Sequence, residues 1–285
     1  MKPQLESVQF RRQSLLIDPL AKRGLIAFIM AGDPDHATTL RMALALIDEG
    51  IIALEIGVPF SDPVADGAVI QAAAARALTN GTTLQSTFQL IAQIKNLRPL
   101  IPIVLFTYLN PILKIGLETF VEKAREHGVD ATLVVDLPPE ESSRHVQVHR
   151  NLGLGTVFLA APNTRADRLR NIVSNSTGFI YAISRAGTTG THRNLATSLG
   201  LQLNELTRIR DGIADAEGRR LPIAVGFGIS TPSQAAEVAA LSDAVIIGSR
   251  FVSLIHESAS ADEAETSVRL FARECIQAIK DANAK

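Results

Sequence analysis

Short apolar runs recur along the chain, separated by segments that mix apolar and polar residues. The runs are rich in β-branched residues, are bounded by Gly, Pro or Asp, and show little alternation between apolar and polar positions. Such continuous runs are typical of strands buried on both faces. Eight runs are present, and they begin at Leu25, Ile51, Ile101, Ala131, Gly155, Gly178, Leu221 and Asp243. The pattern therefore predicts eight buried parallel strands.

The segments between the runs have the spacing of amphipathic helices. Leu40, Ala43, Leu44 and Ile47 follow an i, i+3, i+4, i+7 pattern, and Gly50 then stops the helix. A strand followed by a helix, repeated eight times without a linker, predicts an α/β protein with a (β/α)8 TIM barrel. An open doubly wound sheet is the alternative, but no GxGxxG sequence follows the first strand. Eight units in a chain of this length fit the barrel better.

One barrel domain over residues 1–285 accounts for the whole pattern. The residues before Leu25 are expected to form an extra N-terminal helix that closes the barrel floor. Two connections, residues 61–99 and 186–220, are long. Active sites of such barrels lie where the carboxyl ends of the strands meet the following loops. The long connections therefore predict a functional site at that end.

Composition and charge narrow the classes of function. Of the 285 residues, 46% are hydrophobic and 20% are charged, which excludes a disordered protein. The 28 basic and 29 acidic residues give a net charge of −1, so binding to nucleic acid or to an anionic membrane is not expected. A single cysteine, Cys275, excludes an internal disulfide and any zinc site built from several cysteines. The N-terminal residues lack an apolar leader and no stretch has the composition of a membrane span, so a cytoplasmic protein is expected.

Glycine-rich corners follow the last three predicted strands. They are GTTG at residues 187–190, GFGIS at 226–230 and GS at 248–249. Glycine lets the backbone approach a ligand closely, and a helix N-terminus offers unpaired N–H groups. In barrels, the loops after strands seven and eight commonly bind phosphate. One such corner is more often only a tight turn, but three at one end predict a phosphate site. Because none of the corners contains lysine, neutral backbone donors should hold the phosphate.

Two carboxylates are candidates for proton transfer at the same end of the barrel. Glu55 interrupts the run from Ile51, and period-2 alternation places it on the face opposite Leu54 and Ile56. If those two side chains pack against helices, Glu55 points into the barrel, where burial raises the pKa of a carboxyl toward neutrality. Asp66 follows in the next loop and, as a more solvated group, is expected to stay ionised. The alternatives are a structural ion pair for Glu55 and a helix cap for Asp66.

The sequence LEIGVPFSDPVADGAVIQ at residues 54–71 closely resembles the signature of the tryptophan synthase α subunit family. Further segments fall in the family's order: AGDP at 31–34, Tyr108 with Asn110 and Pro111, SRAGTTG at 184–190, GFGIS at 226–230 and IGS at 247–249. The similarity covers essentially the whole chain. It implies a lyase of tryptophan biosynthesis that cleaves indole-3-glycerol phosphate to indole and glyceraldehyde 3-phosphate. This retro-aldol reaction uses no cofactor and no metal in this subunit.

The resemblance also implies roles for individual residues. Glu55 matches the family's general acid and base, and Asp66 matches the carboxylate that accepts a hydrogen bond from the indole N–H. Tyr181 matches a tyrosine beside the catalytic glutamate. Residues 185–194 match a mobile lid. The indole pocket would be lined by Phe28, Ile70, Phe106 and Phe227; the phosphate would be held by Gly190, Gly228, Gly248 and Ser249; and Thr189 would bond Asp66 when the lid closes.

The family works as an α2β2 complex in which indole passes to a beta subunit that carries pyridoxal phosphate. Residues 59–66 and the Asn110–Pro111 segment match its contact surface. A stand-alone indole-releasing lyase and a non-catalytic subunit that only activates its partner are alternatives, as is a different phosphate-handling barrel. The retained Glu55 and Asp66 argue against the non-catalytic subunit.

Three features depart from the family pattern or stand outside it. Arg250 follows the last glycine corner where a small residue is usual, and it either adds a charge to the phosphate or points to solvent. Residues 201–220 are longer than usual and are expected to form a surface excursion. Glu141, His145 and His149 share one helical stripe, which is expected to be solvated.

Overall fold

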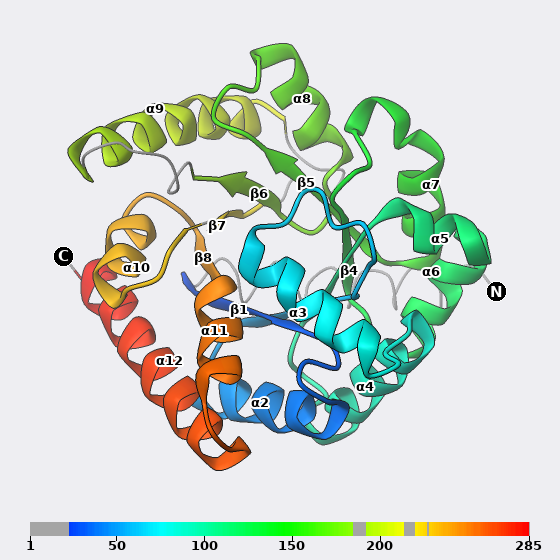
Figure 1. Ribbon diagram of the computed structural model, residues 1–285. Helices are drawn as coiled ribbons and strands as arrows, with labels where there is room; N and C mark the ends of the chain where they lie inside the picture. The colour runs from blue at the N-terminus through cyan, green and yellow to red at the C-terminus, as the bar shows by residue number, and fades with distance from the viewer. Residues whose placement is uncertain (1–22, 185–191, 214–219, 227, 285) are drawn as a thin grey trace.

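Eight parallel strands close into a barrel that is surrounded by helices (Figure 1). The computed structural model describes residues 23–184, 192–213, 220–226 and 228–284. The strands follow one another around the barrel in sequence order, and β8 pairs with β1 to close it. The predicted (β/α)8 barrel is confirmed. The predicted N-terminal helix falls on residues outside the described ones.

Each strand lies within one of the eight predicted apolar runs, apart from Gly24, which extends the first strand by one residue. The strands are β1 (Gly24–Met30), β2 (Ala53–Gly57), β3 (Ile103–Thr107), β4 (Ala131–Val134), β5 (Gly155–Ala160), β6 (Ile180–Ile183), β7 (Ile223–Gly226) and β8 (Ala244–Ile247). Nearly all of their residues are buried. Helices on one face and the barrel interior on the other cover both sides of these strands, which explains why their sequences do not alternate.

Helices connect the strands and form the outer layer. They are α2 (His36–Glu49), α3 (Ala68–Thr79), α4 (Leu84–Leu97), α5 (Leu109–Ile115), α6 (Leu117–Glu126), η1 (Pro139–Glu141), α7 (Ser143–Leu152), α8 (Ala166–Asn175), α9 (His192–Asp211), α10 (Pro232–Ala239), α11 (Ser249–Glu257) and α12 (Ala261–Asn283). The long connection after β2 therefore holds two helices, α3 and α4. Thr83 caps α4 by accepting a hydrogen bond from the N–H of Ser86.

The expectation of a surface excursion over residues 201–220 is wrong for the part that the structure describes. Residues 201–211 belong to α9, and this helix buries Leu203, Leu206 and Ile209. These apolar residues recur every third position, so they share one face of the helix, which packs against the protein core.

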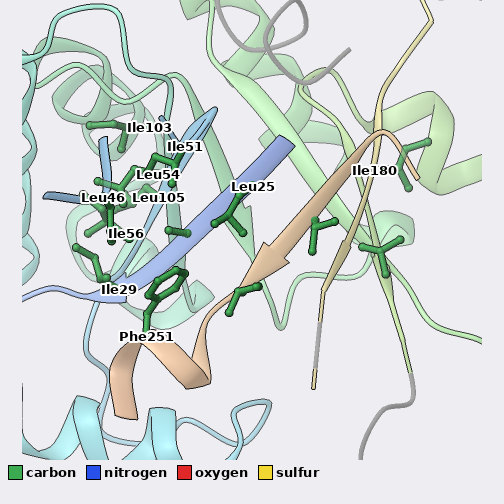
Figure 2. Close-up of a cluster of buried hydrophobic side chains, with 14 of the residues drawn as sticks. Leu25, Ile29, Leu46, Ile51, Leu54, Ile56, Ile103, Leu105, Ile180 and Phe251 are labelled. Carbon is green, nitrogen blue, oxygen red and sulfur yellow. The ribbon is translucent and has the colours of Figure 1, made fainter. Parts of the chain in front are cut away.

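Apolar side chains form one cluster on each side of the barrel wall. The outer cluster includes Leu25, Leu54 and Ile56 of the strands together with Leu46 of α2 and Phe251 of α11 (Figure 2). The inner cluster fills the barrel and comprises alternate residues of the same strands, such as Ile26, Phe28, Val104 and Phe106. Because Leu54 and Ile56 face the helices, the residue between them, Glu55, faces the interior as predicted.

The expectation that His145 and His149 lie on a solvated face is also wrong, because both are buried on α7. The His149 ring lies with Nε2 2.8 Å from Thr132 Oγ1 of β4 and with Nδ1 2.8 Å from the carbonyl oxygen of His145. Burial lowers the pKa of His145 to about 4, and it lowers the pKa of His149 as well. The helix has few apolar residues, so two neutral imidazoles fill the face that packs against the barrel.

Candidate active site

A cavity of about 310 Å³ opens at the carboxyl ends of the strands. Side chains of β1, β2, β3, β6 and β8 form its base, and segments that follow β2, β7 and β8 form its rim. Helix α3, which carries Ile70 at the rim, lies across the mouth of the barrel (Figure 1). Glu55 and Asp66 both line this cavity, so the structure brings the two predicted carboxylates together.

Glu55 is held in the barrel wall in the middle of β2. It is in register with Phe28 of β1 and Val104 of β3, and its side chain is 1% exposed. Its Oε1 atom has no hydrogen-bond partner among the described residues. Burial, and secondarily the nearby charge of Asp66, raises the pKa of Glu55 from 4.5 to about 8. A substantial part of the Glu55 population is therefore protonated at neutral pH.

Asp66 lies in the loop between β2 and α3 and is half-buried. The hydroxyl of Tyr108 donates a hydrogen bond of 3.0 Å to its Oδ2 atom, and the same hydroxyl accepts one of 3.1 Å from the N–H of Ala65. The side chain of Gln71 donates to the carbonyl oxygen of Asp66 at 2.9 Å. Burial raises the pKa of Asp66 to about 6, while the bond from Tyr108 acts in the opposite direction. Asp66 is thus held in place through both its side chain and its main-chain carbonyl.

The two carboxyls have different proton affinities because their surroundings differ. Glu55 is enclosed and, among the residues that the structure describes, has no partner at Oε1, whereas Asp66 is nearer to solvent and accepts the bond from Tyr108. Near pH 7 the first favours its acid form and the second its ionised form. Such a pair can donate a proton at one place and stabilise positive charge at another.

Tyr181 of β6 reaches the same cavity from the opposite wall. Burial, together with the charges of Glu55 and Asp66, raises the pKa of its phenol well above the usual value. The ring lies so close to Gly226 of β7 that any Cβ at that position would collide with the Tyr181 hydroxyl. Gly226 therefore makes room for this side chain, which stays protonated at physiological pH.

Aromatic and aliphatic side chains form an apolar wall next to Glu55. The rings of Phe28 and Phe106 meet edge to face, with centroids 5.3 Å apart and planes at 76°. Ile70 of α3 closes the wall from above. A Cβ at Gly57 would approach the Phe28 ring to 2.7 Å, so this glycine provides the space that the ring occupies. The wall has the flat, apolar character that an aromatic ligand requires.

The glycine corners after β7 and β8 form the other end of the cavity. Gly228, Gly248 and Ser249 all line it. Gly228 has a φ of 78°, a conformation that favours glycine. Gly248 is the N-cap of α11 and, as a glycine, has no side chain to cap the first N–H groups of this helix. The first N–H groups of α11 are therefore directed at the cavity rim, where a helix N-terminus attracts an anion.

Comparison with known proteins decides the family of this barrel. The sequence profile described as "Tryptophan synthase alpha chain" matches residues 19–282. The chain belongs to the tryptophan synthase alpha chain family. Among curated relatives, the tryptophan synthase alpha chain of Geobacillus kaustophilus is 43% identical over 251 residues, covering 87% of this chain and 90% of the relative. That of Caulobacter vibrioides is 41% identical over 262 residues, covering 92% of each.

Solved structures of the tryptophan synthase alpha chain family share the fold. Tryptophan synthase subunit alpha from Legionella pneumophila superposes with a TM-score of 0.84 at 32% identity, covering 95% of this chain and 98% of the other. A chain from the tryptophan synthase a2b2 complex of Pyrococcus furiosus gives a TM-score of 0.79 at 38% identity, covering 89% and 98%.

The structure gathers nine of the twelve residues that the family resemblance implies. The cavity is lined by Glu55, Asp66, Tyr181, Phe28, Ile70, Phe106, Gly228, Gly248 and Ser249. The other three, Thr189, Gly190 and Phe227, lie outside the described residues, as does most of the expected lid at residues 185–194.

Tyr108 is the residue that sequence reasoning missed in this member of the tryptophan synthase alpha chain family. The sequence places it in a family segment but gives it no role. Its signal is indirect: Tyr108 directly follows β3, at the carboxyl end where the loop carrying Asp66 also lies.

Within the described ranges, no group of three or more His, Cys, Asp or Glu side chains is arranged to hold a metal ion. In that same part of the chain, no helix is both long enough and apolar enough to cross a membrane.

Proposed function

We propose that this chain, as a single barrel domain over residues 1–285, cleaves indole-3-glycerol phosphate to indole and glyceraldehyde 3-phosphate. Membership in the tryptophan synthase alpha chain family makes it the lyase subunit of tryptophan biosynthesis. The observation that carries the proposed mechanism is the pair of carboxyls with unequal pKa values, Glu55 at about 8 and Asp66 at about 6, beside an apolar wall. We further propose that the chain works in the cytoplasm.

Glu55 acts as acid and then as base. In its protonated form it donates a proton to C3 of the indole ring, which leaves positive charge on the ring nitrogen. The bond between C3 and the glycerol chain then breaks, and its electron pair returns to the ring to form indole. The hydroxyl proton of the glycerol chain passes to the Glu55 carboxylate as the aldehyde forms. The glutamic acid is regenerated, so the reaction needs no oxidant and no cofactor.

Asp66 stabilises the charged intermediate. Its ionised carboxylate accepts the hydrogen bond of the indole N–H and faces the positive charge that develops there. Tyr181, which stays protonated, sits beside Glu55 and orients the reacting end of the substrate. Phe28, Ile70 and Phe106 hold the indole ring, with Phe227 as a further wall.

The phosphate of the substrate is remote from the breaking bond and binds at the opposite end of the cavity. Backbone N–H groups of Gly190, Gly228, Gly248 and Ser249 hold it, and Thr189 bonds Asp66 when the lid closes. The binding energy of this remote group orients the substrate for the proton transfers at Glu55.

The partner is a tryptophan synthase beta subunit in an α2β2 complex, and the pyridoxal phosphate belongs to that subunit. The assembly of the Pyrococcus furiosus relative supports this proposal. So do two exposed apolar side chains: Val64, in the loop that carries Asp66, is 80% exposed, and Leu113 of α5 is 64% exposed. Tyr108 joins the two segments, because it is the N-cap residue of α5 and bonds Asp66.

Indole release by the purified chain, with and without a beta subunit, tests the mechanism. We expect Glu55→Gln and Asp66→Asn each to lower turnover by at least about 10²-fold, the lower range for a lost proton-transfer group. Arg144→Ala, which removes an exposed residue paired with Glu118 on the outer surface, is the control and should keep normal turnover. Near-normal turnover of Glu55→Gln would refute the mechanism.

The same variants separate the alternatives. A subunit that only activates its partner predicts that Glu55→Gln stimulates the beta subunit as wild type does and that neither form releases indole. A stand-alone lyase predicts full turnover without the beta subunit.

A further inference from the structure

The charges that line the active-site cavity are unevenly distributed. Two carboxyls, Glu55 and Asp66, line the indole end. Arg250 is the only basic side chain among the described lining residues, and it lies at the end formed by Gly248 and Ser249. A substrate with a dianionic phosphate meets two acidic groups in this cavity, so a cation at the far end has a large effect on binding and on orientation.

Arg250 is held only loosely where it stands. It is the second residue of α11, and its side chain is 37% exposed. Its Nη1 atom lies 3.7 Å from Oε2 of Glu257, a side chain that is itself 63% exposed. The guanidinium carbon lies 5.9 Å from the ring centroid of Phe271. Exposed ion pairs of this length contribute little to stability, so the guanidinium can leave Glu257 at small cost.

At the indole end of the cavity, a polar atom has no hydrogen-bond partner among the described residues. Oε1 of Glu55 is buried and unpartnered among the described residues. The cavity thus carries an unsatisfied acidic group at the indole end and a weakly held cation at the phosphate end. A molecule that bonds with both groups would satisfy them together.

We propose that Arg250 is the charged ligand of the substrate phosphate and exchanges Glu257 for the phosphate when substrate binds. This inference rests on the proposed function. The first N–H groups of α11 hold one side of the phosphate, and the guanidinium adds charge-assisted hydrogen bonds from the rim. Glu257 then serves as the resting partner of Arg250 and competes with the phosphate for it. Ser253, one turn further along α11, lines the same rim.

Calorimetric binding of glycerol 3-phosphate and of indole, measured separately, tests this inference. Arg250→Ala should weaken binding of glycerol 3-phosphate by about 5- to 20-fold, the range for a charge-assisted hydrogen bond at a partly exposed site. Binding of indole should not change. Glu257→Gln, which releases Arg250 from its competitor, should strengthen phosphate binding by about 2- to 3-fold. Arg144→Ala removes an arginine from another exposed pair and should change neither affinity.

A merely structural role for Arg250 predicts neither the opposite signs of Arg250→Ala and Glu257→Gln nor the effect of salt. The wild-type affinity for glycerol 3-phosphate should fall more steeply with added KCl than that of Arg250→Ala. Arg250→Lys should keep part of the affinity for glycerol 3-phosphate. Arg250→Gln should bind it as weakly as Arg250→Ala does. If Arg250→Ala binds glycerol 3-phosphate with the affinity and salt dependence of wild type, and wild type releases indole, the inference about Arg250 is wrong and the proposed function stands. Absence of both glycerol 3-phosphate binding and indole release in wild type would instead overturn the proposed function.

Discussion

Buried carboxyls occur at both ends of the barrel, and their surroundings differ. At the floor, Asp130 accepts hydrogen bonds from Lys95 Nζ at 2.7 Å and from the N–H of Ile103 at 2.8 Å. Asp243, which precedes β8, repeats the arrangement: it accepts from Arg210 Nη1 at 3.0 Å and from the N–H of a β7 residue at 2.8 Å. Each floor carboxylate thus joins a helix cation to the start of the preceding strand.

In the cavity at the mouth of the barrel, the carboxyls of Glu55 and Asp66 have few partners, although Asp33 after β1 is paired with Arg76 at 2.7 Å. Oε1 of Glu55 has none among the described residues, and Asp66 receives a single side-chain bond, from Tyr108. Removal of one partner from a buried ion pair destabilises the fold, because the other charge is left unsatisfied, whereas an unsatisfied group at the end of a cavity is available to a ligand. The same kind of side chain thus has a structural role at one end and a chemical role at the other.

The largest effect is expected at the floor. Lys95→Met leaves the buried Asp130 carboxylate without its cation, so the free energy of unfolding should fall by about 3–5 kcal/mol. Urea unfolding followed by circular dichroism measures this change. The double variant Lys95→Met with Asp130→Asn leaves no unpaired charge at this position and should recover part of the loss. Indole release per folded molecule should remain normal in both. If Lys95→Met unfolds at the wild-type urea concentration, the floor and the mouth do not differ as described.

At the mouth, removal of a carboxyl should have the opposite effect on stability. The pKa of Glu55 rises from 4.5 to about 8 on folding, so its contribution to stability is complete below pH 4.5 and is lost as the pH rises through 8. Glu55→Gln removes this loss. The variant should be more stable than wild type by on the order of 2–4 kcal/mol at pH 8.5, and the difference should shrink toward pH 4.5.

Urea unfolding at pH 4.5, 6.5 and 8.5 measures this dependence. Asp66→Asn is the matched comparison, because the pKa of Asp66 rises only from 3.8 to about 6. Asp66→Asn should also be more stable than wild type, but its stability difference should change between pH 3.8 and about 6. An equal stability difference between Glu55→Gln and wild type at all three pH values would show that folding does not raise the pKa of Glu55.

The fold and the orientation of Glu55 could be predicted from sequence because both depend on local patterns. The continuous apolar runs mark strands that are covered on both faces, and alternation within β2 places Glu55 opposite Leu54 and Ile56. The glycine corners at Gly228 and Gly248 could be placed at one end, since parallel strands all finish there.

Features that depend on contacts between distant segments could not be predicted. The bond from Tyr108 to Asp66 joins residues 42 positions apart and requires the strand order of the barrel. The burial of His145 and His149 follows from what α7 packs against, because the pattern of the helix itself indicates a solvated face. The raised pKa of Glu55 needs the enclosed cavity, which the sequence of β2 alone does not contain.

The smallest effect is expected at Asp66. With one side-chain bond, from Tyr108, it is intermediate between the paired carboxylates of the floor and Glu55. Tyr108→Phe removes the donor, so the pKa of Asp66 should rise and the acidic limb of the pH profile of kcat/KM should move to higher pH. At pH 7 turnover should fall by about 5- to 20-fold, near the lower limit for the loss of one hydrogen bond to a charged group. Phe60→Leu is the matched control: Phe60 stacks on Tyr108 with centroids 4.9 Å apart but makes no bond to Asp66. It should leave the acidic limb in place. A role of Tyr108 in packing alone predicts equal effects of the two variants, whereas control of Asp66 by its hydroxyl predicts a shifted limb only in Tyr108→Phe.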